Sequence, residues 1–222
     1  MINESNGVRV PVQERSRKTR ERIVEAGKEL FARKGYHQSG VKEIARLAGV
    51  AVGSFYAYFP DKAALFLEIT EGYYQRIFAR LQDEMQRGVR SDMFDSPGGR
   101  KEVVGNLIQA LYHAHDIEPE LHRELLMMML AGGNDSDDDA DAGLHRLIRE
   151  RVDAMDREVQ AWLEDIIRQH APSAHAKAAA AVVFRSAEES IHRLKLFPET
   201  MPPADEVIAE LSRMLYAYLF DE

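Results

Sequence analysis

The sequence from residue 41 to residue 65 decides the fold and reads VKEIARLAGVAVGSFYAYFPDKAAL. Its first eight residues place apolar side chains at helical spacing, which predicts a short helix over 41–48. Those apolar residues are Val41, Ile44, Ala45 and Ala48. Gly49 follows at a sharp turn that needs a positive φ, and a second short helix is expected over 52–58. Two short helices joined by a glycine-containing turn make a helix-turn-helix, whose second helix can enter the DNA major groove.

A longer helix is expected on each side of this stretch. Upstream, apolar residues at helical spacing predict a helix over 17–34, and Gly35 can take the left-handed conformation that often ends a helix. Those apolar residues are Ile23, Ala26, Leu30 and Phe31. Downstream, a sustained apolar stripe predicts a helix over 61–88. Glu43 lies three residues after Gly40, which is the spacing of a capping box.

The rest of the chain is also predicted to be helical. Prolines divide it into long segments of helical period, and no segment alternates as a half-buried strand would. The sequence therefore predicts an all-α fold of about nine helices. Their expected ranges are 17–34, 41–48, 52–58, 61–88, 99–116, 119–131, 142–170, 173–196 and 204–220. The glycine-rich, acidic residues 132–141 are expected to form a solvated loop.

Charge is divided unevenly along the 222 residues, whose net charge is −8. Residues 1–62 hold 12 Lys+Arg and 7 Asp+Glu, a balance of +5, while residues 63–222 hold 17 and 30, a balance of −13. This asymmetry is typical of a protein that meets a polyanion at one end, although chance clustering on a solvated face would give the same balance. We expect a flexible basic arm over 1–15, a helix-turn-helix domain over 16–62, and a helical ligand-binding and dimerisation domain over 63–222.

Several function classes are disfavoured by what the sequence lacks. It has no cysteine, which excludes disulfide scaffolds and thiolate zinc sites. No apolar run approaches the roughly 20 residues of a membrane span, and residues 1–10 hold no signal-peptide stretch, so we expect a cytoplasmic protein without a membrane partner. The nucleophile-elbow, zinc-protease and phosphate-loop motifs are missing. The prediction is a protein that is not an enzyme and that uses no cofactor and no metal.

Residues 19–67 resemble the amino-terminal part of the TetR family of transcriptional regulators. The residues that match the family's spacing are Ile44-Ala45, Ala48-Gly49-Val50, Gly53-Ser54-Phe55-Tyr56, Tyr58-Phe59 and Lys62. The rest of the chain agrees with the family in length and helical character only. The resemblance implies a homodimer that binds an inverted-repeat DNA operator, most simply as a repressor. It also implies that a small molecule bound in the body moves the helix over 61–88 and releases the DNA.

The resemblance further implies contacts to phosphates and bases for eight residues. They are Ser39, Lys42, Val52, Gly53, Ser54, Tyr56, Tyr58 and Lys62. Among them, Tyr56 and Lys62 are implied to bind phosphate, and phosphate contacts fix the register of a protein on its duplex. Many family members have Thr or Ser where this chain has Gly40, so a hydroxyl contact is missing there and Ser39 or Lys42 is expected to compensate.

The last two helices, 173–196 and 204–220, carry apolar stripes wider than one neighbour within the chain would cover. With a second copy they would form a four-helix bundle, although the same stripes would also close an intrachain core. The resemblance favours the dimer.

A ligand pocket is expected in the domain over 63–222, although each candidate residue is also an ordinary core residue. The candidates are Tyr112, Met127, Met128, Trp162, Phe184 and Glu188. Six consecutive apolar residues, 125–130, predict that the helix over 119–131 is buried on all sides. His113 and His115 are two residues apart and do not share a helix face, so we interpret them as surface or pocket-rim residues and not as metal ligands.

The function predicted from these patterns is a ligand-responsive, DNA-binding transcriptional regulator. Its expected partners are operator DNA, a small hydrophobic or amphipathic effector, and a second copy of the chain. The alternative is an all-α small-molecule-binding or protein-interaction module without operator binding. Ligand binding in the absence of duplex binding would distinguish that alternative.

Overall fold

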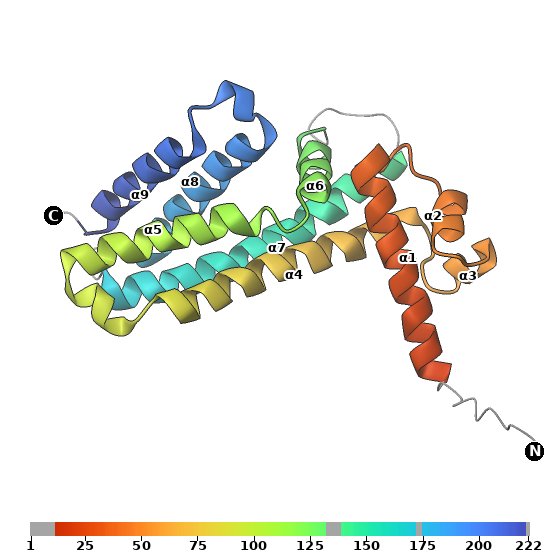
Figure 1. The fold of residues 1–222 in the computed structure, drawn as a ribbon, viewed down its shortest axis with the longest axis horizontal. Helices are drawn as coiled ribbons and strands as arrows, with labels where there is room; N and C mark the ends of the chain where they lie inside the picture. Colours follow the sequence, from red (N-terminus) through yellow and green to blue (C-terminus); the bar gives the residue numbers. More distant parts are fainter. Residues whose placement is uncertain (1–11, 132–138, 172–174, 221–222) are drawn as a thin grey trace, which may run out of the picture. The chain divides into compact units, whose positions relative to one another are not determined.

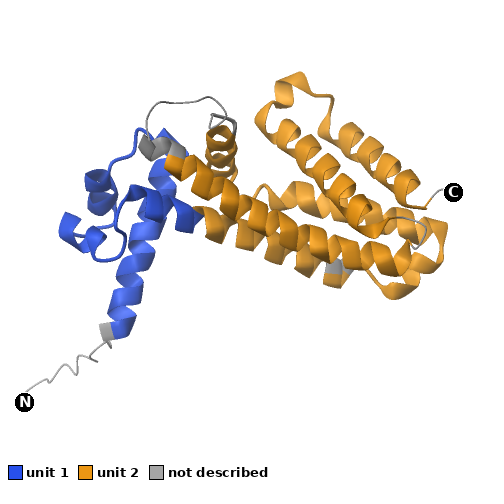
Figure 2. Cartoon of the chain, turned by 180° about the vertical axis from the view of Figure 1, so that it is seen from behind, with its two compact units in different colours: residues 1–69 blue, residues 70–222 orange. Residues whose placement is uncertain are grey.

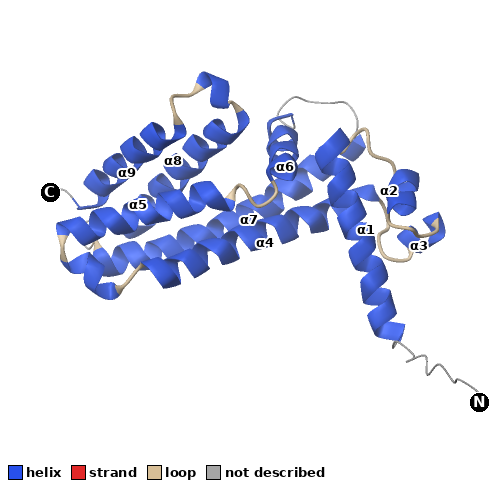
Figure 3. Cartoon of the chain, in the orientation of Figure 1, coloured by secondary structure: helices blue, strands red, loops and turns tan. Residues whose placement is uncertain are grey.

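The structure is a computed structural model that describes residues 12–131, 139–171 and 175–220. Within these ranges it holds nine α-helices, two short 3-10 helices and no strand, which confirms the all-α prediction (Figures 1 and 3). The elements are α1 (Val12–Lys34), α2 (Val41–Leu47), α3 (Val52–Tyr56), α4 (Lys62–Gly88), η1 (Ser91–Asp95), α5 (Pro97–Ala114), α6 (Pro119–Ala131), α7 (Asp139–His170), α8 (Ala176–Leu196), η2 (Pro198–Thr200) and α9 (Ala204–Phe220).

The first helix begins five residues earlier than the sequence pattern predicts. Residues 12–15, expected in the arm, belong to α1, and residues 1–11 of the arm lie outside the described residues. The early turns are stabilised by pairs one helical turn apart, Glu14 with Lys18 and Arg17 with Glu21. The apolar stripe used for the prediction could not detect these polar turns. Most of the acidic loop expected over 132–141 also lies outside the described residues, and α7 begins at Asp139.

The chain divides into two compact units, residues 1–69 and residues 70–222 (Figure 2). The division lies inside α4, whereas the sequence predicts a domain boundary after residue 62, at the start of that helix. Each unit has its own buried apolar core.

In unit 1, aromatic side chains from α1, from the turn after it and from α4 form the core. The rings of Phe31 and Phe66 meet edge-on with their centroids 5.1 Å apart, and the ring of Tyr36 lies 5.0 Å from that of Phe66. Gly27 allows α1 to approach α4 closely, because a Cβ at this position would lie 2.8 Å from Leu65 Cδ2. This core holds the helix-turn-helix in place.

Two glycines end the first two helices as expected. Gly35, after α1, has a φ of 80°, and Gly49, after α2, has a φ of 65°. In the left-handed region a side chain would strain the backbone, so both turns favour glycine. The second turn sets the course of the chain between α2 and α3.

In unit 2, α7 packs along α8, α5 packs against α9, and α8 contacts α9. Beside them, the ring of Phe94 on η1 stacks on His170 at the end of α7, with centroids 3.7 Å apart. The prediction that the helix over 119–131 is buried all round is wrong, because Met127 on α6 is 43% exposed. Its neighbours Leu126 and Met128 are buried, so α6 has one exposed face in spite of its uniformly apolar sequence.

Candidate nucleic-acid interface and effector pocket

The helix-turn-helix separates its residues into an inner and an outer face. Ile44 and Ala45 on α2 and Phe55 on α3 are buried. The outward apolar side chains are Leu47, Val52 and Tyr56, which rank among the exposed large apolar residues of the described chain. Apolar side chains on a protein surface can contact thymine methyl groups in the major groove. The outer face of α2 and α3 therefore has the composition of a groove-facing surface.

The first turn of α3 has open space beside Gly53 and the hydroxyl group of Ser54. Tyr56 is 54% exposed, and its ring stands edge-on to the buried ring of Phe55 at 5.4 Å between centroids. Gly53 is exposed, and a Cβ built there would meet no atom of the described residues within 4 Å, so none of them requires a glycine at this position. Ser54 is half-buried beside it, and Lys42 is exposed on the first turn of α2.

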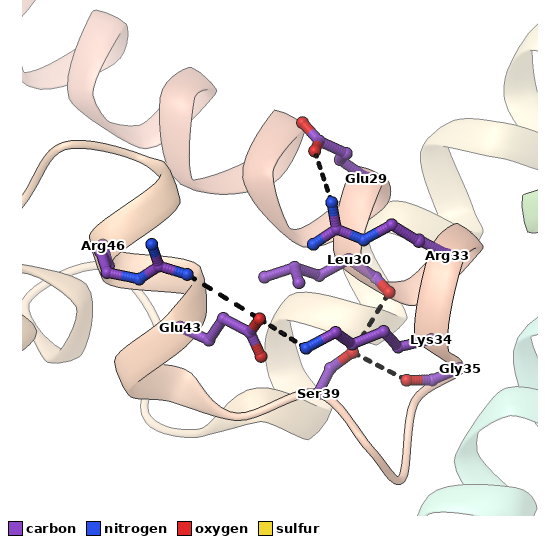
Figure 4. Close-up of polar contacts among 8 residues, drawn as sticks. All are labelled: Glu29, Leu30, Arg33, Lys34, Gly35, Ser39, Glu43 and Arg46. Carbon is purple, nitrogen blue, oxygen red and sulfur yellow. Dashed lines mark hydrogen bonds and ion pairs between the residues drawn. The ribbon is translucent and has the colours of Figure 1, made fainter.

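The structure corrects the role expected for Ser39. This residue is only 3% exposed, and its hydroxyl lies 2.8 Å from the carbonyl oxygen of Gly35 and 3.3 Å from that of Leu30 (Figure 4). The hydroxyl thus donates its hydrogen bond at the end of α1, to the nearer carbonyl of Gly35, and lies close to that of Leu30. Ser39 therefore stabilises the turn between α1 and α2, and its buried hydroxyl is not on the outer surface where a DNA contact was expected.

The capping box expected at the start of α2 does not form. Gly40 is the N-cap residue, with a φ of −112° and no side-chain cap hydrogen bond. Glu43 instead accepts a hydrogen bond of 2.6 Å from the ammonium group of Lys34 at the end of α1, and Arg46 lies 4.0 Å away (Figure 4). The hydrogen bond from Lys34 lowers the pKa of the Glu43 carboxyl. The acid therefore joins α1 to α2 and does not cap α2.

Lys62 and Tyr58 also make contacts within the protein. The Lys62 ammonium group donates a hydrogen bond of 2.7 Å to the carbonyl oxygen of Tyr36 and lies 3.9 Å from the centre of the Tyr36 ring. The hydroxyl of Tyr58 lies 3.2 Å from Ser16 Oγ on α1. Both side chains are half-buried. Tyr58 joins the turn after α3 to α1, and Lys62 joins α4 to the turn after α1. These contacts give Lys62 a structural part within unit 1, and its expected contact with phosphate stays a prediction.

In unit 2, exposed apolar side chains lie on the last two helices. Val182 on α8 and Met214 and Tyr218 on α9 are all about half exposed. Met214 and Tyr218 are four residues apart and so share a face of α9. The inner residues of the same helices, such as Ile191 and Leu215, are fully buried. Each of these helices thus has one buried apolar face and, on another face, apolar side chains that are exposed to solvent.

A small pocket lies among α4, α7, α8 and the end of α5. Its lining residues are Tyr74, Ile77, Phe78, Leu81, His115, Met155, Asp156, Glu158, Val159, Phe184 and Glu188. Of the six residues expected from the sequence, Phe184 and Glu188 line it. The other four do not: Tyr112 faces the Lys195 ammonium group at 3.5 Å, and Met127 is exposed. Met128 is buried on α6, and Trp162 is half-buried on α7.

The polar part of this pocket is acidic. Asp156, Glu158 and Glu188 contribute carboxylates, and no lysine or arginine is among the lining residues. Burial raises the pKa of Asp156 to about 6, although the guanidinium group of Arg185, 2.9 Å away, acts in the opposite direction. An acidic, largely apolar pocket favours a ligand with an apolar body and a neutral or cationic polar group.

Three histidines that sequence reasoning did not group together meet beside this pocket. His115, expected on the surface or at a pocket rim, is buried, and it lies with His122 and His192 in one cluster. Burial lowers the pKa of His115, and burial together with the nearby histidines lowers the pKa of His122 to about 2. His113 is exposed, as expected. Since the three histidines come from separate helices, no spacing in the sequence could have identified the cluster.

None of the helices in the described part of the chain combines the length and apolar character that a bilayer crossing needs.

Two family patterns match the chain. Residues 23–69 match the family described as "Bacterial regulatory proteins, tetR family", and residues 138–219 match "Tetracyclin repressor-like, C-terminal domain". The first match covers the helix-turn-helix and the start of α4, and the second covers much of α7, α8 and α9.

Individual proteins match over part of the sequence or in the fold. The HTH-type regulator YuxN of Bacillus subtilis is 41% identical over 66 residues, which are 30% of this chain and 23% of that protein. A putative transcriptional regulator from Pseudomonas aeruginosa has a solved structure with a TM-score of 0.67, 22% identity and 97% of each chain covered. For FadR of Bacillus subtilis, solved in complex with stearoyl-CoA, the TM-score is 0.60 at 19% identity, covering 90% of this chain and 97% of that one.

Proposed function

Because the chain belongs to the TetR family of transcriptional regulators, we propose that it represses transcription by binding an inverted-repeat operator as a homodimer. A small hydrophobic or amphipathic effector bound in unit 2 releases the DNA. The observation that carries the proposal is the outer face of α2 and α3, where Tyr56, Val52 and Lys42 are exposed over a buried aromatic core. A helix-turn-helix dimer reads half-sites roughly 10–10.5 base pairs apart, or a multiple of that spacing.

The homodimer forms through α8 and α9. Both helices carry exposed apolar side chains, and Met214 and Tyr218 are among them. They support this proposal, because an isologous contact would bury the same side chains of both copies. A single chain leaves these side chains in water, where they contribute little to stability.

The effector binds in the pocket that Phe184 and Glu188 line. Four residues of α4 also line it, Tyr74, Ile77, Phe78 and Leu81, and α4 begins at Lys62 directly after the helix-turn-helix. An effector that binds one arrangement of α4 better than another shifts the population between them. The carboxylates of the lining support an effector that carries a neutral or positively charged polar group.

A gel-shift experiment with the full chain tests the proposal. The probe is the duplex upstream of the protein's own gene, with a random duplex of equal length as the competitor. We expect a preference for the upstream duplex, and no preference would contradict operator binding. Added dodecylamine is expected to release the complex at a lower concentration than stearoyl-CoA, the ligand of the Bacillus subtilis FadR structure. Release by stearoyl-CoA alone would contradict the effector chemistry and leave operator binding intact.

A further inference from the structure

Three imidazole rings form a nearly equilateral triangle in unit 2. The ring centroids of His115 and His122 are 4.6 Å apart, and each of these rings lies 5.3 Å from the ring of His192. One nitrogen from each ring can be chosen so that all three lie within 4.8 Å of one another. His115 caps the end of α5, His122 lies on α6 and His192 lies on α8.

A carboxylate lies at the edge of this triangle. Oε2 of Glu188 is 2.9 Å from Nε2 of His192 and 3.9 Å from Nε2 of His115. Glu188 and His192 are four residues apart and share a face of α8, so the helix itself holds them side by side. The cluster thus offers three nitrogen atoms and one oxygen atom from three helices.

His122 has buried ring nitrogen atoms without hydrogen-bond partners in the described chain. His122 is 2% exposed, and neither Nδ1 nor Nε2 of its ring has a hydrogen-bond partner within the described chain. A buried polar atom without a partner costs free energy, so these nitrogen atoms are suited to a partner from outside the protein, a water molecule or an ion.

The orientation of His115 suits a ligand on its Nε2 atom. Its Nδ1 donates a hydrogen bond of 2.7 Å to the carbonyl oxygen of Leu111, one turn earlier in α5. This bond places the proton on Nδ1 and leaves the lone pair of Nε2 directed at the cluster. Metal-binding histidines commonly make such a hydrogen bond with the nitrogen that does not bind the metal.

We propose that His115, His122 and His192, together with Glu188, bind one divalent transition-metal ion of the Zn²⁺, Ni²⁺ or Co²⁺ class. Imidazole nitrogen suits these ions, and three histidines with one carboxylate complete a tetrahedral set. Neighbouring ligand atoms in such a site are about 3.3 Å apart. The three histidine nitrogen atoms lie within 4.8 Å of one another, so small rotations of the side chains would bring them to the separation that an ion requires. The ion would join α5, α6 and α8, and it would lie beside the pocket, because His115 and Glu188 also line that pocket.

The test is a titration of the full-length, untagged protein with Co²⁺ alone after dialysis against a chelator. An untagged chain is essential because a polyhistidine tag binds Co²⁺ itself. We expect one Co²⁺ ion per chain, with the strong visible absorption of a tetrahedral site, and displacement of Co²⁺ by Zn²⁺. A free Zn²⁺ concentration about one hundred times the dissociation constant is expected to raise the melting temperature of the protein by about 5–10 °C.

Matched variants assign the site to the cluster. His122→Gln and His192→Gln are expected to weaken Co²⁺ binding by about tenfold or more. His113→Gln replaces an exposed histidine two residues from His115 and is expected to leave Co²⁺ binding unchanged. If a cluster variant fails to fold, X-ray absorption spectroscopy of the Zn²⁺-loaded wild-type protein replaces it. The spectrum is expected to show the scattering of imidazole rings that coordinate the ion. A wild-type chain that binds no Co²⁺, or equal binding by the cluster and control variants, overturns the proposal without affecting operator binding.

Discussion

The ammonium group of Lys62 at the start of α4 donates a hydrogen bond to the carbonyl oxygen of Tyr36, 2.7 Å away, and lies over the ring of the same residue. Tyr36 belongs to the turn between α1 and α2. One side chain therefore joins α4 to the turn that orients the helix-turn-helix. Through this contact Lys62 helps to hold the outer face of α2 and α3 in place.

Lys62→Met keeps the aliphatic stem and removes the charge and the hydrogen bond. We expect the free energy of unfolding to fall by about 2 kcal/mol, because a charged hydrogen bond and a cation–π contact are lost. Thermal unfolding of the full chain measures the change. Lys42→Met is the control, since Lys42 is exposed on α2 and its loss is expected to reduce the salt dependence of DNA binding without changing stability. A Lys62→Met protein as stable as the wild type would contradict this role.

Gly49 and Gly53 are expected to respond oppositely to alanine. Gly49→Ala places a Cβ on a backbone with a φ of 65° and lowers the free energy of unfolding by about 1 kcal/mol. Gly53→Ala adds a methyl group in open space on α3 and raises the same quantity by up to about 1 kcal/mol, while the methyl group hinders DNA approach. Denaturant unfolding and duplex affinity, measured on both variants, separate the two effects. Equal stability changes at the two positions would refute the argument.

Gly40→Ser supplies the side chain that the first turn of α2 lacks. The backbone of Gly40 is extended and a Cβ there meets no atom of the described chain within 4 Å, so serine fits without strain. We expect a gain of about 0.3 kcal/mol in the free energy of unfolding and tighter duplex binding through the added hydroxyl. Gly40→Ala is the comparison, because alanine fits equally well but cannot cap. If alanine matches serine in both assays, the hydroxyl plays no part.

Met214→Glu and Tyr218→Glu test the proposed dimer surface on α9. Both side chains are about half exposed in the single chain, so each variant is expected to fold, while a carboxylate buried in the interface would separate the copies. Sedimentation equilibrium is expected to give the mass of two chains for the wild type and of one chain for the variants. Met127→Glu, on the exposed face of α6, is the control and stays dimeric. A monomeric wild type would disprove the interface.

The fold was largely predictable because its determinants are local. The turns at Gly35 and Gly49 and the apolar stripes of the long helices depend on neighbouring residues only. The early start of α1 was missed because ion pairs such as Glu14 with Lys18, and not apolar side chains, extend the helix. A pattern of apolar residues contains no information about that extension.

The site was less predictable, because side-chain contacts between helices do not follow from spacing. Ser39 and Lys62 have residue types that suit DNA contacts, yet both make hydrogen bonds to carbonyl groups within unit 1. His115 and His192 are 77 positions apart in sequence, and only the packing of α5 against α8 brings them together. Tyr56 was easier to place, because its neighbour Phe55 occupies the inner face of a short helix.

The central claim is that the outer face of α2 and α3 binds the phosphates of duplex DNA. Fluorescence anisotropy of a labelled upstream duplex, measured over a series of salt concentrations with wild-type protein and Tyr56→Phe, tests it most directly. If each subunit neutralises three or four phosphates, the logarithm of affinity falls with the logarithm of salt concentration at a slope of roughly −5 to −7. Tyr56→Phe, which removes an exposed hydroxyl, is expected to weaken binding to every duplex by about five- to tenfold. A wild-type slope near zero, or a variant that binds as tightly as the wild type, would contradict the claim.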